Sequence, residues 1–328
     1  MRDRAARMRA GLKEHGTPGN VADPRISVDL AHLRVLQAKA RRITFLPRQP
    51  ARSILNGRHA SRLRGRGLNF EELRQYLPSD DVRAIDWKVT ARTGTPHVRI
   101  FTEERDRPTL IVVDQRMSMF FGSELNMKSV TAAQCAALSA FRIHDQGDRV
   151  GGIVFGDQAI AEIRPGRSRR SLDAFLTALA DANSLLSAEA PVSTPMPLNQ
   201  VLKSVARIAK RDHLVLVFSD FDETDALTHK LVAGISRHND LVLGLVSDPY
   251  TDTLPKGRRI VVSDGTLQAE IDTGDTKVHR RLTEMAKGRL AEVLDWQRLY
   301  GIPVLPLTTA RDSVEQMAHY MGLAGRRL

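Results

Sequence analysis

Two apolar strands in this 328-residue sequence end in an aspartate, and polar side chains follow each of them. The stretch "TLIVVDQRMS" places Asp114, Arg116 and Ser118 at alternate positions, and "VFSDFD" places Asp220 and Asp222 two residues apart. At the end of a strand, an Asp followed by hydroxyls two and four residues on can supply several of the oxygen ligands that Mg²⁺ prefers. Asp114 and Ser118 fit this spacing, but Arg116 stands where the middle hydroxyl is needed.

Arg116 is the residue on which the interpretation of this stretch depends. A guanidinium is always charged and offers only hydrogen-bond donors, so beside Asp114 and Asp220 it opposes the binding of a divalent cation. It can instead bridge the two carboxylates in the place of the cation. Two other arrangements stay open: weak Mg²⁺ binding with Arg116 turned outward, and a strand end without a ligand. We favour the paired arrangement, and we therefore expect no cofactor.

From residue 108 onward, apolar strands alternate with helices. Strands are expected at 109–114, 149–156, 158–166, 213–220, 240–249 and 302–307, and a separate hairpin at 258–272. Helices are expected at 27–42, 123–147, 168–183, 197–212, 224–239, 276–300 and 311–322. This order predicts an α/β fold with a mostly parallel sheet flanked by helices, and with an irregular N-terminal extension. The carboxyl ends of neighbouring parallel strands meet at one edge, so we expect Asp114 and Asp220 to lie together there.

Charge divides the chain unevenly. Residues 1–107 hold 23 Lys and Arg against 12 Asp and Glu, so the whole excess of +11 lies in this third. Residues 1–25 read as a flexible basic tail, which allows a nucleic acid or another anionic surface as a partner. The single cysteine, Cys135, excludes an internal disulfide, and no apolar run has the length of a membrane span. We therefore expect a cytoplasmic protein.

The segment 56–107 contains a long sequence motif. It resembles the hallmark of the domain-of-unknown-function-58 family, G-x-h-x-S-x-x-R-G-x-G followed by F-x-x-x-R-x-Y-x-P-G-D-D-x-R-x-I-D-W-x-x-x-A-R. Ser79 stands where that family usually has Gly. We expect the matching residues to be structural, with Trp87 as a buried anchor, and to lie where residues 26–107 pack on a sheet domain of residues 108–328. These residues are Gly65, Gly67, Arg74, Tyr76, Asp80, Asp81, Arg83, Asp86, Trp87 and Arg92.

Residues 108–328 resemble a von Willebrand factor A-type domain, a Rossmann-like fold whose metal-ion-dependent adhesion site has the pattern D-x-S-x-S. Asp114, Ser118 and Asp220 match three positions of that site. The threonine ligand of the family falls in the loop "VSTPMPLNQVL", where Thr194 is close but Met196 takes the aligned position. The resemblance thus implies a degenerate metal site.

These resemblances imply an adaptor rather than an enzyme. Relatives of the first family are often encoded beside MoxR-type AAA+ ATPases and are thought to act with them, in a chaperone-like role, in the assembly or maturation of other complexes. In the second family, a partner's carboxylate completes the metal shell, so Arg116, with Asp114 and Asp222 beside it, is expected to receive such a carboxylate directly. The sequence contains no G-x-S-x-G or H-E-x-x-H motif. The alternatives are nucleic-acid binding by the basic segment and metal-dependent hydrolysis at Asp114 and Asp220, which Arg116 disfavours.

Overall fold

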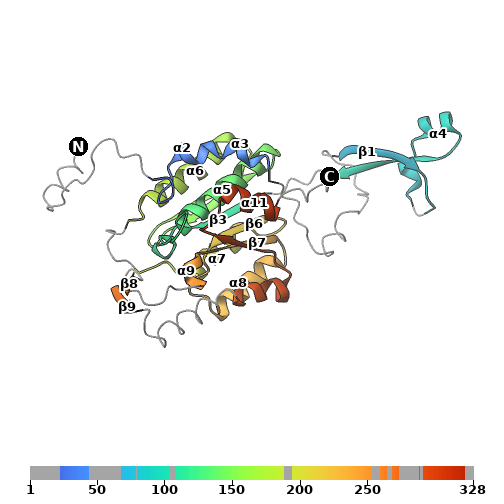
Figure 1. Cartoon of the computed structure of the whole chain (residues 1–328). Helices are drawn as coiled ribbons and strands as arrows, with labels where there is room; N and C mark the ends of the chain where they lie inside the picture. Colours follow the sequence, from blue (N-terminus) through green and yellow to red (C-terminus); the bar gives the residue numbers. More distant parts are fainter. Residues whose placement is uncertain are drawn as a thin grey trace.

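The centre of the computed structural model is a six-stranded sheet in the order β10-β7-β6-β3-β4-β5 (Figure 1). The structure describes residues 23–43, 68–78, 80–103, 108–187, 194–252, 259–263, 268–272, 288 and 291–321. The strands of this sheet are β3 (Thr109–Asp114), β4 (Val150–Phe155), β5 (Ile160–Gly166), β6 (Leu214–Ser219), β7 (Asp240–Ser247) and β10 (Val304–Thr308). Only β4 and β5 pair antiparallel. The predicted α/β fold with a mostly parallel sheet is confirmed.

Side chains alternate between two cores along each central strand, because successive residues of a strand point to opposite faces. In β3, Ile111 and Val113 enter one core, whereas Leu110 and Val112 enter the other. All six residues of β3, β4 and β6 are buried, which is why these strands read as unbroken apolar runs.

Helices cover both faces of the sheet. The first face carries α5 (Lys128–Asp145), α6 (Arg169–Ser184) and α11 (Ser313–Met321). The second carries α7 (Leu198–Ile208), α8 (Ala226–Ser236) and the helical residues 291–300. Short helices, η3 (Met117–Met119) and α9 (Pro249–Asp252), follow β3 and β7. None of the helices in the described ranges has the length and apolarity to span a bilayer.

The first helical segment of the chain forms a third layer. α2 (Leu30–Val35) and α3 (Gln37–Ala40) lie over α5 and α6 and bury Leu33 and Ile43 completely (Figure 1). Asp29 caps α2 by accepting a hydrogen bond from the His32 N–H, so the helix expected at 27–42 begins later than predicted. The predicted basic tail falls almost entirely outside the described residues.

A separate unit follows in the chain. β1 (Leu68–Gln75) and β2 (His97–Glu103) pair antiparallel, and their connection holds η2 (Val82–Ala84) and α4 (Trp87–Thr93). Figure 1 shows this unit extending away from the sheet, so the part of the 26–107 segment that packs on the sheet domain is α2 and α3. A second small hairpin, β8 (Arg259–Ser263) with β9 (Gln268–Asp272), matches the predicted one at 258–272.

The start of the predicted helix 123–147 differs from the structure. α5 begins at Lys128 rather than at residue 123, because Ser123 and the Asn126 N–H are hydrogen-bonded to groups that follow β7 and β10. Only residues 288 and 291–300 of the helix expected at 276–300 lie within the described ranges, and they are helical.

Both edge strands of the six-stranded sheet contain a proline, Pro165 in β5 and Pro306 in β10.

Candidate functional site

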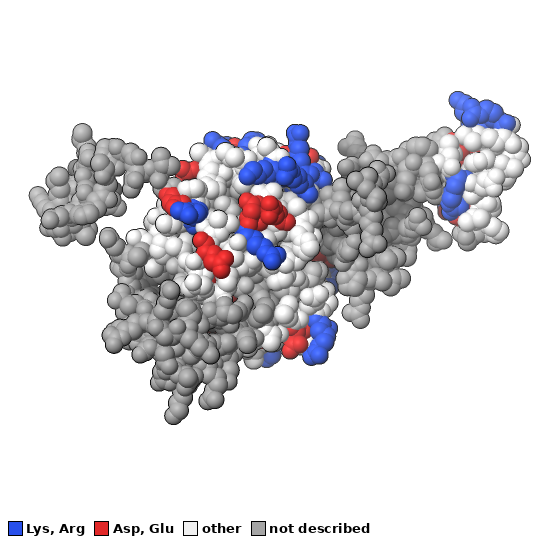
Figure 2. Space-filling model, in the orientation of Figure 1, with Lys and Arg blue, Asp and Glu red and all other residues white. Residues whose placement is uncertain are grey.

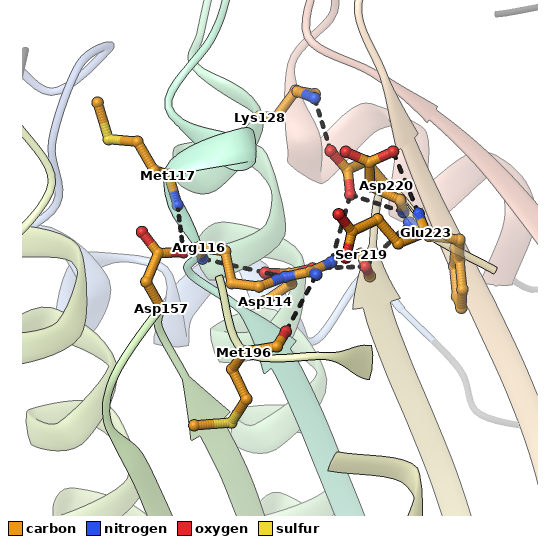
Figure 3. A network of polar contacts seen from close by, with 11 residues as sticks. Asp114, Arg116, Met117, Lys128, Asp157, Met196, Ser219, Asp220 and Glu223 are labelled. Atoms are coloured by element: carbon orange, nitrogen blue, oxygen red, sulfur yellow. Dashed lines mark hydrogen bonds and ion pairs between the residues drawn. The ribbon is translucent and has the colours of Figure 1, made fainter. Parts of the chain in front are cut away.

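The sheet topology brings the two predicted aspartates together. β3 and β6 are neighbours and pair in parallel, with Val113 opposite Phe218, so Asp114 and Asp220 leave the sheet side by side. Figure 3 shows both carboxylates at this carboxyl edge, with Arg116 and Lys128 directed toward them. We call Asp114, Arg116, Lys128, Ser219 and Asp220 the carboxylate cluster.

Arg116 lies against Asp114, as expected for the paired arrangement. Its Nη2 is 2.8 Å from Asp114 Oδ2 and its Nε is 3.1 Å from Asp114 Oδ1. Nη2 also lies 3.8 Å from Asp220 Oδ1, while Nη1 donates to the Met196 carbonyl at 3.3 Å. The guanidinium stands over the Phe155 ring at 5.6 Å from its centroid. One side chain thus links the ends of β3, β4 and β6 to the loop before α7.

A second cation completes the cluster. Lys128, the first residue of α5, places its Nζ 2.8 Å from Asp220 Oδ2. Ser219 donates its hydroxyl to Asp114 Oδ2 at 2.6 Å and accepts the Phe221 N–H at 3.0 Å. Two carboxylates therefore face two cations, and the cluster is neutral as a whole.

The electrostatics of the cluster favour the ionised pair. Burial raises the pKa of the Asp114 carboxyl, and the Arg116 guanidinium and the Ser219 hydroxyl oppose that rise. Burial also acts to lower the pKa of Arg116, but the charges of Asp114 and Asp220 outweigh it, and the pKa lies above the ordinary arginine value. The contacts at Asp114 all come from donors, namely the guanidinium, the Arg116 N–H and the Ser219 hydroxyl. A proton on this carboxyl would have no acceptor to bind, because its neighbours are all donors. We therefore assign the ionised form of Asp114 near neutral pH.

The side chains of the carboxylate cluster do not fit a magnesium ion. Mg²⁺ needs carboxylate oxygens that are free to coordinate it, but both oxygens of Asp114 already accept hydrogen bonds, and Asp220 Oδ2 accepts one from Lys128. Within the described ranges, no three His, Cys, Asp or Glu side chains are placed to share a metal ion.

The other predicted ligands lie near the cluster without joining it. The Ser118 hydroxyl is buried and has no hydrogen-bond partner. Thr194 is exposed, and its loop contributes the Met196 carbonyl instead. Asp222 is half-buried, and its N–H donates to Asp220 Oδ1 at 3.2 Å.

Burial changes the role that Arg116 can have. Arg116 is 1% exposed and Asp114 is fully buried. In this arrangement a partner's carboxylate has no direct access to Arg116, so the expectation that Arg116 receives one stays a prediction that requires the cluster to open. Of the three predicted partner-binding residues, Asp222 alone has an accessible side chain.

The loop after β6 is held in an unusual conformation. Phe221 and Glu223 have φ values of 52° and 60°, in the left-handed region that costs free energy for residues other than glycine. The Phe221 side chain is 1% exposed and packs edge-on against Trp296, with ring centroids 5.9 Å apart. Buried contacts thus fix the loop and turn the Glu223 side chain to solvent.

A second buried carboxylate fastens the neighbouring loop. Asp248 follows β7 and is fully buried. It accepts hydrogen bonds from the Ser123 hydroxyl at 2.6 Å, the Thr309 hydroxyl at 2.5 Å and the Tyr250 N–H at 2.9 Å. The loop after β3 is therefore tied across the ends of β7 and β10.

The family model described as "Protein of unknown function DUF58" matches residues 72–291. The chain belongs to the DUF58 family. It is also 28% identical over 310 residues to the uncharacterized protein Mb1516 of Mycobacterium bovis and to the uncharacterized protein Rv1480 of Mycobacterium tuberculosis. Each alignment covers 94% of this chain and 92% of the relative.

Several residues of the DUF58 signature form turns and caps in the unit of β1 and β2. Arg74 holds Asp80 through two hydrogen bonds of 2.7 Å. Asp81 accepts the Arg83 N–H and caps η2, while Asp86, 7% exposed, accepts the Lys88 and Val89 N–H groups and caps α4. Tyr76 N–H donates to the Pro96 carbonyl. These contacts agree with a structural role.

The structure corrects the expectation that Trp87 is a buried anchor. Its side chain is 65% exposed, and among the side chains of residues 73–78 and 80–98, whose burial is described, only Asp86 and Val98 are buried. Arg83 and Arg92 are exposed as well, and Gly65 and Gly67 lie outside the described residues.

Sequence reasoning missed Lys128 and Ser219 as members of the cluster. Lys128 carries no clear signal in the sequence, because the helix expected at 123–147 places it in the second turn, and only the later start of α5 makes it the first helical residue beside Asp220. Ser219 directly precedes Asp220 in the quoted motif, but only the register of β3 and β6 aims its hydroxyl at Asp114.

Proposed function

We propose that this DUF58 protein is a non-enzymatic adaptor. In this proposal it works with a MoxR-type AAA+ ATPase in the assembly or maturation of a protein complex, and its sheet domain is a von Willebrand factor A-like domain with a degenerate adhesion site. The observation that carries the proposal is the closed, neutral carboxylate cluster. A hydrolase at this position needs a carboxylate that is free to hold a metal ion or to activate water, whereas both oxygens of Asp114 are bound to donors.

The surroundings of the cluster support a role in binding proteins. Around the carboxyl edge of the sheet, Phe121, Leu125 and Tyr250 are 42%, 40% and 36% exposed. Glu124 and Glu223 are exposed nearby on loops that follow β3 and β6. Exposed aromatic and aliphatic side chains with polar groups at their rim are typical of a protein interface. We call these five residues the edge surface.

The test is a binding measurement between the purified chain and a purified MoxR-type ATPase from the same genome. We expect equal affinity in 5 mM Mg²⁺ and in EDTA, at roughly physiological ionic strength. Binding in Mg²⁺ alone would show that an ion still takes part in the site. No binding in either buffer would refute the proposed partner. Phe121→Ala should weaken the complex, whereas Leu299→Ala, which removes an apolar side chain that is 61% exposed on the helix 291–300, should not.

Nucleic-acid binding by the basic segment remains the alternative. Much of the basic excess falls on residues 1–22 and 44–67, which lie outside the described ranges. A fluorescent oligonucleotide tests it directly, because binding through phosphate contacts weakens steeply as the salt concentration rises.

A further inference from the structure

The far end of the β1–β2 unit exposes a large amount of apolar surface. The connection between the two strands runs from Tyr76 to Pro96 and is 21 residues long. In it, Leu77, Val82 and Trp87 are 53%, 56% and 65% exposed. A two-stranded hairpin is marginally stable alone in water, so this unit gains from any surface that covers these side chains.

The capping contacts hold this exposed surface in place. The Asp86 N–H donates to the His97 carbonyl at 2.8 Å, and the His97 N–H donates to the Thr90 hydroxyl at 3.1 Å, so α4 is tied to β2 at two points. Trp87 is therefore presented from a fixed helix rather than from a loose loop. A preorganised tryptophan is a common centre of binding energy in protein interfaces.

Basic side chains surround the apolar ones. Arg83, Lys88 and Arg92 are exposed, and within the described ranges none of the three forms an ion pair. Figure 2 shows the unit as mostly uncharged surface, with Lys and Arg side chains at its outer end. We call Leu77, Val82, Arg83, Trp87, Lys88 and Arg92 the hairpin tip.

The edge surface is the complement of the hairpin tip. It offers exposed apolar side chains at Phe121, Leu125 and Tyr250, together with the carboxylates of Glu124 and Glu223. Two cations of the carboxylate cluster, Arg116 and Lys128, are buried and paired with Asp114 and Asp220, and the exposed Arg25, whose carbonyl accepts the Met127 N–H, is paired with Asp23. The edge therefore presents acidic and apolar groups, whereas the tip presents basic and apolar ones.

The two surfaces lie at opposite ends of the molecule. β2 leads into the amino end of β3, whereas the edge surface follows the carboxyl ends of β3, β6 and β7. Figure 1 shows the β1–β2 unit pointing away from the sheet on the side opposite to α9. A tip of one molecule is thus placed to meet the edge of another.

We propose that the hairpin tip of one copy of this chain docks on the edge surface of a second copy. Such a contact joins two different surfaces, so it is head-to-tail and builds rings or open chains rather than a symmetric dimer. Six residues at the tip and five at the edge make a contact smaller than a standard protein interface, so we expect weak, concentration-dependent association. This proposal does not rest on an ATPase partner and is tested with the purified full chain alone.

The experiment is sedimentation velocity at about 1–100 μM protein, the range in which weak interfaces associate. We expect the wild type to associate with rising concentration and to dissociate in high salt, because the charges at the contact are screened. Trp87→Ala, at the tip, and Phe121→Ala, at the edge, should each weaken association about tenfold or more. Leu299→Ala is the matched control and should associate like the wild type.

A mixture of the two variants gives the decisive result. The Trp87→Ala chain keeps an intact edge and the Phe121→Ala chain keeps an intact tip, so an equal mixture should form a 1:1 dimer that neither variant forms alone. A monomeric wild type at every concentration, variants that associate normally, or a mixture that stays monomeric would each overturn the proposal. If Trp87→Ala disturbs the folding of the β1–β2 unit, Lys88→Glu tests the same surface, because this side chain is exposed and the change reverses its charge.

Discussion

Replacing Arg116 by methionine tests whether the guanidinium holds the carboxylate cluster together. The change keeps most of the length of the side chain but leaves the fully buried Asp114 with only the Ser219 hydroxyl and the N–H of residue 116 as donors. Removing one partner of a buried ion pair costs about 3–5 kcal/mol, because the remaining charge is left uncompensated. For a domain of this size, that loss lowers Tm by roughly 6–20 °C.

The assay is urea unfolding followed by circular dichroism, with an exposed ion pair as the control. Arg207 and Glu162 are 2.6 Å apart, but their side chains are 61% and 29% exposed, so Arg207→Met should cost at most about 1 kcal/mol. The double variant Arg116→Met with Asp114→Leu should recover most of the stability, because well-packed apolar groups often replace a buried pair at no net cost. If Arg116→Met costs no more than Arg207→Met, the assignment of Arg116 as the resident cation is refuted.

The remaining predictions concern ions, protons and packing. Arg116→Ser removes the guanidinium from the cluster. If Arg116 keeps Mg²⁺ out of the wild type, 10 mM Mg²⁺ should raise the Tm of this variant and leave the Tm of the wild type unchanged. An unchanged Tm of the variant would count against this explanation. Burial raises the pKa of the Cys135 thiol to about 12, so iodoacetamide at pH 8 should label it only in urea, as mass spectrometry can check. Hydrogen bonds from Asn199 and Thr228 lower the pKa of the Asp225 carboxyl to about 2. The stabilising effect of Asp225 is therefore complete above its unfolded pKa near 4 and is lost as the pH falls toward 2. Asp225→Asn should flatten the dependence of Tm on pH over that range. Gly152→Ala places a Cβ 2.3 Å from the Phe175 ring and 2.5 Å from the Ile111 carbonyl, and should lower stability by about 1–3 kcal/mol in the same urea assay.

The sequence was sufficient to predict the sheet because its strands carry strong local signals. β3 and β6 are apolar runs that end in aspartate, and the parallel class follows from their alternation with helices. The meeting of Asp114 and Asp220 follows from the same class, because neighbouring parallel strands end at one edge. The pairing of Arg116 with Asp114 is the arrangement that charge favours among the three that the sequence leaves open, since a guanidinium two residues from a buried carboxylate gains from binding it.

The features that could not be predicted from the sequence depend on contacts between segments that are distant in the chain. Lys128 reaches Asp220 only because α5 begins five residues later than the pattern suggests, and that start is set by the binding of Ser123 to Asp248. The sequence predicts a core position for Trp87, but its side chain is 65% exposed, and among the side chains of residues 73–78 and 80–98, whose burial is described, only Asp86 and Val98 are buried. No local rule states whether such a unit packs on the sheet domain or extends from it.

The proline in the edge strand β10 limits how this protein can aggregate or be extended by added strands at that edge. Leu305, Leu307 and the following Thr309 direct their N–H groups toward β7, as the Thr309 bond to the Ser247 carbonyl indicates, so position 306 faces outward. Proline lacks the N–H that an incoming strand would need there. The β10 edge is therefore protected against edge-to-edge growth, which favours association through loops and the projecting hairpin.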